Sequence, residues 1–405
     1  MKILHTADWH LGKRLGEYSR LPEQELVLEE ICQISEKEEV DAVLIAGDLF
    51  DTFHPGNDAA ELLYRTVYRL SNGGQRAVIA IAGNHDSPDR VESTDLLARS
   101  CGIIFQGHPK NQVPLFCTEG GVRVLRSAPG FLEIQLPECS YPLRLLSTPY
   151  ANELTLKRHL GIKKSEALQE VLKQQWQELG QSYCDDQGVN VLMAHLYAAS
   201  PDEEMPEEPE DEKPVLHIGG ISAIGPDAFP EQVQYVALGH LHRYHTVSQS
   251  PCPILYSGTP LSYSFSEAGQ KKYVTLVEVS PGTPAKVVPI ELTQGQRLIR
   301  KRFFNTEDAI QWLEAHPDTF VELTLVSDTY IDAKSKKTLY AAHSGIVSII
   351  PEIIRPQVEA NEQPRINLQD NLSSLFSRYF EHKRGQTPND ELMTLFREVI
   401  EAEEV

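Results

Sequence analysis

Paired cysteines, long apolar runs and a leader segment are all missing from this chain of 405 residues. Its six cysteines are scattered and form no C-x-x-C pair, which excludes a disulfide framework or a cysteine zinc knuckle. No run of about eighteen or more apolar residues occurs, so we expect no membrane span. Met1 leads directly into an apolar segment and leaves no room for a signal peptide. These absences predict reduced thiols and a cytoplasmic location.

Positive charge is also scarce. The chain has 37 Lys and Arg against 58 Asp and Glu, a net charge of −21. Proteins that bind nucleic acid unaided depend on Lys and Arg to contact phosphates. If the substrate is DNA, we therefore expect bound divalent metals and a partner subunit to supply much of the positive charge. Part of the acidity is local, because residues 202–212 hold eight acidic side chains in a segment typical of a mobile loop.

Short apolar runs are present, and five of them end in side chains that bind metals. Each run is rich in Val, Ile, Leu and Ala, which is typical of a strand buried on both faces. Ligands of open α/β sheets bind at the carboxyl ends of the strands, so we expect these side chains to meet in one site. The runs and their terminal residues are Ile3–Ala7 with Asp8 and His10, Ala42–Ala46 with Asp48, Val78–Ala82 with Asn84 and His85, Val189–Ala194 with His195, and Val233–Leu238 with His240 and His242.

The residue types at these strand ends indicate a transition-metal site. A mixture of carboxylates and imidazoles suits Mn, Fe or Zn better than Ca or Mg. Taken alone, Asp8-x-His10 is more often a capped strand end than a pair of ligands, and Gly47-Asp48 is equally unspecific. The specific signal is the complete set in this order.

In this order the motifs resemble those of the calcineurin-like metallophosphoesterase superfamily. The resemblance implies an α/β fold, a β-sandwich flanked by helices, with two divalent ions, most often manganese, and Asp48 bridging them. His85 becomes the candidate general acid for the leaving oxygen, and Asp86 is expected to orient it. The ligands implied are Asp8, His10, Asp48 and His242 for one ion, and Asp48, Asn84, His195 and His240 for the other.

Longer stretches are similar to the SbcD family of nuclease subunits. This similarity implies a metal-dependent 3′→5′ double-strand DNA exonuclease with endonuclease action at hairpins, acting in DNA repair and recombination. It also implies a homodimer bound to two SMC-like ATPase subunits of the SbcC type. The stretches are residues 3–12 (ILHTADWHLG), 46–52 (AGDLFDT), 82–87 (AGNHDS), 235–243 (YVALGHLHR) and 256–266 (YSGTPLSYSFS).

Two positions depart from the expected pattern. The third residue after Asp48 is Asp51, where archaeal relatives carry a histidine, and whether Asp51 or His54 contacts substrate stays open. His195 follows Met193-Ala194 and lacks the preceding glycine often found at this motif.

The pattern along the chain predicts three parts. Residues 1–280 alternate strand and helix signals and would form the nuclease domain. After the turn signal at 281–284, residues 285–358 predict a small α+β capping domain. Residues 365–405 predict a helical tail with two apolar stripes, which favours docking on the ATPase partner; packing on the chain's own domain is the alternative.

Two other interpretations compete with a DNA nuclease. The metal site alone also fits another calcineurin-like phosphodiesterase or phosphatase that acts on a small-molecule or protein phosphoester. A non-catalytic scaffold is the second, and a missing ligand would suggest it. Here every expected ligand position is filled.

Overall fold

The computed structural model of the protein describes residues 1–150, 168–200, 223–327, 331–353, 372–384, 388 and 392–396. The chain divides into two compact units, Met1–Glu352 and Ile353–Val405. The predicted division into three domains stays a prediction. The acidic segment 202–212 lies outside the described residues.

A six-stranded sheet carries three of the predicted strand ends, in the order β15-β14-β1-β4-β5-β6. The four strands from β1 to β6 are parallel, and β14 and β15 join them antiparallel. Residues 281–284, the turn signal predicted to separate the first two domains, form the turn between β14 and β15, so this sheet continues beyond them. The strands are β1 (Lys2–Thr6), β4 (Ala42–Ile45), β5 (Ala77–Ile81), β6 (Ile103–Gln106), β14 (Lys272–Glu278) and β15 (Lys286–Leu292).

A seven-stranded sheet carries the other two strand ends, in the order β12-β13-β11-β10-β9-β8-β7. Its central strands β9, β10, β11 and β13 are parallel, and β7, β8 and β12 are added antiparallel. The strands are β7 (Arg123–Ala128), β8 (Phe131–Gln135), β9 (Leu143–Thr148), β10 (Val189–His195), β11 (Tyr235–Gly239), β12 (His245–Ser248) and β13 (Ile254–Tyr256).

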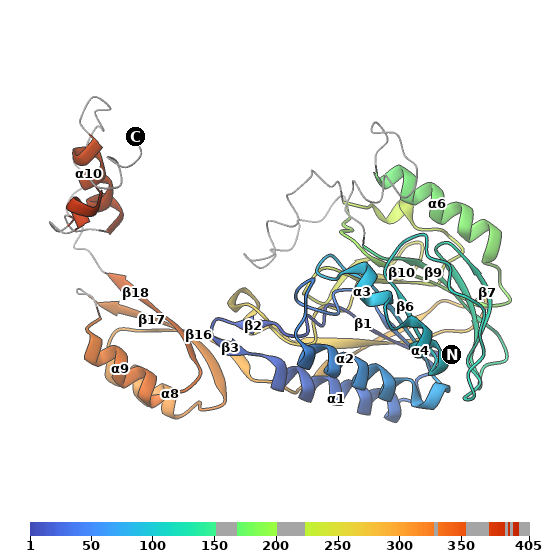
Figure 1. Cartoon of the computed structure of the whole chain (residues 1–405), viewed down its shortest axis with the longest axis horizontal. Coiled ribbons are helices and arrows are strands. Elements are labelled where there is room, and N and C mark those ends of the chain that lie inside the picture. The colour runs from blue at the N-terminus through green and yellow to red at the C-terminus, as the bar shows by residue number, and fades with distance from the viewer. Residues whose placement is uncertain are drawn as a thin grey trace. The chain divides into compact units, whose positions relative to one another are not determined.

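The two sheets pack face to face around a shared apolar core that includes Ile3 and Ile79 from one sheet and Val191 from the other. Figure 1 shows helices α1 (Leu21–Lys37) and α2 (Asn57–Leu70) on one side of this sandwich and α6 (Leu168–Tyr183) on the other. The central strands of each sheet are covered by the other sheet on one face and by helices on the other. This burial on both faces explains their continuous apolar runs. The predicted α/β sandwich flanked by helices is confirmed.

Smaller local predictions met mixed outcomes. The composition of Val113–Phe116 also predicts a strand, and this prediction is wrong, because these residues have no strand structure. The sequence also predicts a helix at Ser93–Arg99, and the structure has α4 (Asp95–Ser100) there, after the short α3 (Pro88–Glu92). Two-residue strands β2 (Arg14–Leu15) and β3 (Tyr18–Ser19) form a hairpin after the first metal motif. Short 3-10 turns occupy Asn72–Gly74, Pro226–Ala228 and Phe265–Glu267.

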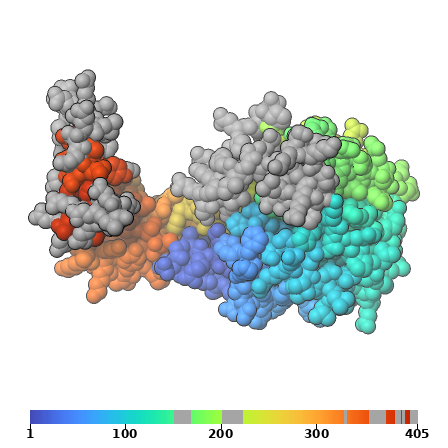
Figure 2. All heavy atoms as spheres, turned by 45° about the horizontal axis from the view of Figure 1, so that its top comes forward, coloured from blue at the N-terminus to red at the C-terminus, as the bar shows by residue number. Residues whose placement is uncertain are grey.

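A third sheet, ordered β16-β17-β18, forms the α+β element predicted after the sandwich. Its own core joins buried residues of β17 to those of two helices, among them Leu323 and Leu339. A second cluster of Leu15, Phe265, Leu298 and Phe320 packs this sheet against the sandwich, where the orange segment meets the blue one in Figure 2. The elements are β16 (Arg297–Phe303), α8 (Thr306–Glu314), β17 (Thr319–Ser327), α9 (Ala333–Ala342) and β18 (Ile346–Ile353).

The second unit contains the helices predicted for the tail. α10 spans Leu372–Arg384, and residues 392–396 are helical. The rings of Phe376 and Phe396 stack with centroids 3.9 Å apart, so the two apolar stripes face each other. Among all residues that the structure describes, no helix is long and apolar enough to cross a membrane. All six cysteines lie in described segments and are free thiols.

Candidate metal centre

The five predicted strand ends meet at one edge of the sandwich. Asp8 and Asp48 lie on adjacent loops, where the Asp8 N–H donates to the Gly47 carbonyl over 2.9 Å. The opposite sheet reaches the same loop, because the His240 N–H donates to the carboxylate of Asp8 at 3.0 Å. All seven residues proposed from the sequence as metal ligands are thereby brought together.

Four of these residues form the first group of donor atoms. The Nε2 atoms of His10 and His242 are 3.0 Å apart. His10 Nε2 is also 3.6 Å from Asp48 Oδ2. Ligand atoms of Asp8, His10 and Asp48 all lie within 4.8 Å of one another. This is the set that the family resemblance implies for one ion.

The second group shares Asp48 with the first. Asn84 Oδ1 lies 2.9 Å from His195 Nε2 and 2.9 Å from His240 Nδ1. Asp48 Oδ2, which faces the first group, is 3.4 Å from His195 Nε2. Ligand atoms of Asp48, His195 and His240 lie within 4.8 Å of one another. One carboxylate oxygen therefore stands between both groups.

The spacing of these donors fits bound divalent ions. Two nitrogen ligands about 2.1 Å from one ion and at right angles to each other are about 3 Å apart. The contact between the two Nε2 atoms, and both contacts of Asn84 Oδ1, have this spacing. One hydrogen atom can bridge only one pair of donor atoms, whereas one divalent ion in each group would contact all the donor atoms of that group.

Backbone strain is concentrated in the same loops. Six described residues other than glycine have positive φ, and four of them belong to the centre: Asp8 (53°), His10 (45°), Asp48 (48°) and His240 (109°). Such conformations are costly and persist only where the surroundings enforce them. The backbone conformations that bring these side chains together therefore lower the stability of the loops.

Buried polar side chains enforce the first strained loop. The amide of Gln24, fully buried in α1, donates to the carbonyl of His10 at 2.8 Å and to that of Trp9 at 3.2 Å. Its oxygen accepts from the Gly12 N–H at 3.0 Å. The Tyr263 hydroxyl also donates to Trp9 O at 2.5 Å. The backbone from Trp9 to Gly12, which carries His10, is thus held by both Gln24 and Tyr263.

Glycines let the loops approach one another. A Cβ on Gly83 would lie 2.1 Å from Asp48 Oδ1, and one on Gly47 would lie 2.1 Å from His195 Nδ1. Neither contact is possible for a real side chain. The glycines in the Gly47-Asp48 and Gly83-Asn84 motifs are therefore required by the closeness of the donors.

Asp86, predicted to orient His85, makes a different set of contacts. Its carboxylate accepts hydrogen bonds from the backbone N–H groups of Leu49 (3.0 Å), Phe50 (2.9 Å) and Gly83 (2.8 Å). These donors belong to the loops that carry Asp48 and Asn84. Asp86 thereby ties two ligand-bearing loops together, and an effect on His85 stays a prediction.

His85 lies beside the first group. Its ring is edge-on to that of His10, with centroids 4.8 Å apart, and its Nδ1 contacts the Asp51 carbonyl at 2.9 Å. A carbonyl only accepts, so Nδ1 carries the hydrogen that it donates to Asp51. The His85 backbone N–H donates to Asp48 Oδ1 at 2.8 Å, which joins it to the bridging residue.

Burial and neighbouring charges move the pKa values of the centre in opposite directions. Burial raises the pKa of Asp8 to about 7. Burial acts the same way on Asp48, but His195 and His10 outweigh it and hold the pKa of Asp48 well below its ordinary value. The Asp48 carboxylate in turn outweighs the effect of burial on His195 and raises its pKa to about 9. Negative charge is thus concentrated on the carboxylate that both groups share.

Sequence reasoning missed several residues around the centre. Gln24 and Tyr263 support the first loop, and the Tyr150 ring lies 6.0 Å from His195 and 6.5 Å from His240 between ring centroids. No motif marks them, because their roles depend on contacts between distant segments. Of the two residues left open, Asp51 Oδ1 lies 3.7 Å from His10 Nδ1, whereas His54 is exposed.

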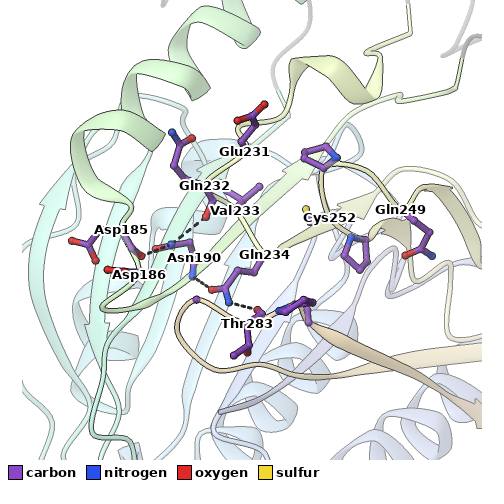
Figure 3. Close-up of a pocket in the computed structure, with 15 residues that line it drawn as sticks. Asp185, Asp186, Asn190, Glu231, Gln232, Val233, Gln234, Gln249, Cys252 and Thr283 are labelled. Carbon is purple, nitrogen blue, oxygen red and sulfur yellow. Dashed lines mark hydrogen bonds between the residues drawn. The ribbon is translucent and has the colours of Figure 1, made fainter.

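A cavity of about 680 Å³ lies away from this centre. It is at the amino ends of β10 and β11, where Asn190 and Gln234 line it (Figure 3). None of the predicted site residues lines it. Its polar lining includes a hydrogen bond from Gln234 to the Thr283 carbonyl, so it belongs to the packing of the β14–β15 turn.

Known proteins resemble the chain over most of its length, and one of them over nearly all of it. Residues 1–244 match the family model described as calcineurin-like phosphoesterase. A protein of Bacillus subtilis named as the SbcD component of the nuclease SbcCD is 31% identical over 98% of this chain and 97% of its own. Proteins of the same name from Rhodobacter capsulatus and Staphylococcus epidermidis, each 31% identical, cover 72% and 69% of this chain and 69% and 66% of theirs. The chain therefore belongs to the calcineurin-like phosphoesterase family and, within it, to the SbcD family.

Proposed function

We propose that this protein is a nuclease subunit that hydrolyses phosphodiester bonds of double-stranded DNA at a dinuclear metal centre. The observation that carries the proposal is the pair of donor groups that share Asp48 Oδ2, 3.6 Å from His10 Nε2 and 3.4 Å from His195 Nε2. The relatives named as components of a nuclease supply the substrate class.

The residues that would hold the ions are those predicted from the sequence, and we expect manganese at both positions. A dinuclear centre of this kind lowers the pKa of water, orients in-line attack on phosphorus and neutralises developing charge. One ion would be held by Asp8, His10, Asp48 and His242, and the other by Asp48, Asn84, His195 and His240.

His85 is the proposed general acid. With Nδ1–H donated to the Asp51 carbonyl at 2.9 Å, the ring is fixed in one orientation and can deliver a proton from Nε2 to the leaving oxygen. Asp86 contributes indirectly, because its three backbone hydrogen bonds hold the loops of Asp48 and Asn84 in register.

The assembly is proposed as a homodimer of this chain bound to two SMC-family ATPase subunits of the SbcC type, in the cytoplasm. A net charge of −21 favours a partner that contributes to DNA binding. The adjacent Leu96 and Leu97 of α4 are 77% and 76% exposed and suit contact with a second copy. On α10, Leu372 and Tyr379 are each 60% exposed and suit docking on the ATPase.

The proposed 3′→5′ exonuclease and hairpin endonuclease activities are tested with labelled duplex and hairpin DNA, with manganese, and with and without the co-purified ATPase. We expect cleavage by the wild-type protein that is lost in His85→Ala while metal content persists. His108→Ala is the matched control, because His108 pairs with Asp89 rather than with the centre.

The main alternative is a calcineurin-like phosphodiesterase or phosphatase for smaller or protein phosphoesters. It would be favoured by hydrolysis of a small phosphodiester without any DNA cleavage, even with the ATPase present. Wild-type protein that binds no divalent metal would contradict both functions.

A further inference from the structure

The ring of His242 has a polar neighbour at each of its nitrogen atoms. Nε2 faces His10 Nε2 at 3.0 Å, on the side of the proposed ion. Nδ1 lies on the opposite side, 3.8 Å from Glu267 Oε1. A histidine ligand whose far nitrogen meets a carboxylate has a fixed ring orientation and a more basic ligating nitrogen.

Glu267 is itself held in place. It is 2% exposed, and its Oε1 accepts from the backbone N–H groups of Tyr263 and Ser264, each at 3.2 Å. Its Oε2 forms an ion pair with Lys272, which is 7% exposed. The carboxylate therefore cannot turn away from His242 without breaking buried hydrogen bonds.

Lys272 completes the arrangement. Besides Glu267, its ammonium donates to Thr259 Oγ1 at 2.8 Å and to the carbonyl of His242 itself at 3.0 Å. All three of its N–H donors thereby have acceptors. The pair contacts His242 at the ring through Glu267 and at the backbone through Lys272.

Fold stability alone does not account for this pair. Burying two charges is costly, and apolar residues of similar size often stabilise a core at least as well. The position of Glu267 and Lys272 next to the proposed metal ligand His242 suggests a role for the pair in the centre. The same arrangement recurs at the other histidine of the first group, where Lys13 Nζ is 3.0 Å from Asp51 Oδ1 and this oxygen is 3.7 Å from His10 Nδ1.

The second group is supported differently. His195 Nδ1 contacts the backbone carbonyl of Ala46 at 2.8 Å. The carboxylate on that side, Asp8 Oδ1 at 3.8 Å, belongs to a proposed ligand of the first group and not to a lysine-paired supporting residue. We propose that Glu267 and Lys272 are positioning residues that orient His242, so that affinity for the ion of the first group depends on them while the second position does not. This inference rests on the proposed dinuclear centre.

The test is manganese binding by the full chain, measured by titration calorimetry and by electron paramagnetic resonance. We expect two ions in the wild-type protein, with the spectrum of a coupled pair. Removing one member alone leaves a buried charge and can unfold the chain, so the decisive variant is the neutral pair Glu267→Gln with Lys272→Met. It should bind one ion about 10–100-fold more weakly and show the spectrum of isolated manganese.

Two further variants and a fold check separate the outcomes. Lys272→Arg keeps the charge and should retain most of the coupled signal. Lys271→Met removes a neighbouring lysine that is 64% exposed and pairs with Glu291, and it should match the wild type. Circular dichroism of metal-free protein must show the neutral variant folded. Two tightly bound ions in that variant would overturn the inference alone, whereas wild-type protein without a manganese pair would overturn the proposed centre as well.

Discussion

Acid should destabilise this protein partly through one histidine, His5 of β1. The ring is fully buried and connects the two sheets, since Nε2 contacts the Leu238 carbonyl at 3.1 Å and Nδ1 the Tyr235 hydroxyl at 2.8 Å. The carbonyl requires hydrogen on Nε2, so the neutral ring accepts from Tyr235 at Nδ1. Burial, opposed only in part by the contact with Leu238, lowers the pKa of His5 from 6.5 to about 3.

The sign of the effect follows from proton binding. Above pH 6.5 His5 is neutral in the folded and unfolded states and has no effect on pH dependence. Below it the unfolded chain binds a proton that the folded chain rejects, so the free energy of unfolding falls with pH until the folded ring also titrates near pH 3. One pKa unit corresponds to about 1.4 kcal/mol, so the full effect is about 5 kcal/mol, of which about 3 kcal/mol is lost by about pH 4.5.

The assay is urea unfolding of metal-free protein at about pH 7 and pH 4.5 for the wild type and His5→Gln. Glutamine keeps a donor for Leu238 and does not titrate. We expect His5→Gln to be less stable near neutrality but to lose about 3 kcal/mol less than the wild type on acidification. His54→Gln, at an exposed histidine, should follow the wild type. An equal loss in the wild type and His5→Gln would refute the reasoning.

Four further predictions concern the centre and the assembly. Asp86→Ala leaves three buried N–H groups without their acceptor and should lower the free energy of unfolding by about 3–5 kcal/mol, measured by urea unfolding. It should also weaken manganese binding, measured by calorimetry. The control is Asp89→Ala, whose side chain is 93% exposed and which should change neither quantity. Gln24→Leu should weaken manganese binding about tenfold in the same titration by freeing the loop of His10; unchanged affinity would contradict the support assigned to Gln24. Chelation should abolish DNA cleavage and manganese restore it. Leu97→Glu should shift the protein toward monomer in light scattering, and an unchanged mass would argue against α4 as the dimer contact.

The strands at the centre could be predicted because burial on both faces leaves a clear apolar run. β1, β4, β5, β10 and β11 all lie where such runs occur, and parallel pairing then brings their carboxyl ends to one edge. Outer strands carry weaker signals. β8 (FLEIQ) was not predicted because Glu133 interrupts its apolar pattern, and in the folded chain this carboxylate is neutralised by Arg144 from β9 and by Arg126.

The domain boundary predicted at 281–284 also rests on a local signal. Pro and Gly mark a turn, and a turn within a hairpin has the same composition as a turn between domains. A hairpin turn differs from a turn between domains only in that the strands on either side of it pair, as Lys286–Leu292 pairs with β14. Neither strand's sequence alone predicts that pairing.

Supporting residues were hardest to predict, for a physical reason. Ligands can be recognised because strand ends and residue type coincide, but Glu267 acts on His242 through a contact between side chains 25 positions apart, and Gln24 acts on His10 from a helix. A buried Glu, Lys or Gln breaks the apolar pattern that sequence reasoning follows. Such breaks, together with the positive φ angles of Asp8, His10, Asp48 and His240, are unfavourable features that the fold tolerates around the centre. Buried polar side chains and positive φ angles therefore identify the residues that support this site, but only when the structure shows that they lie together.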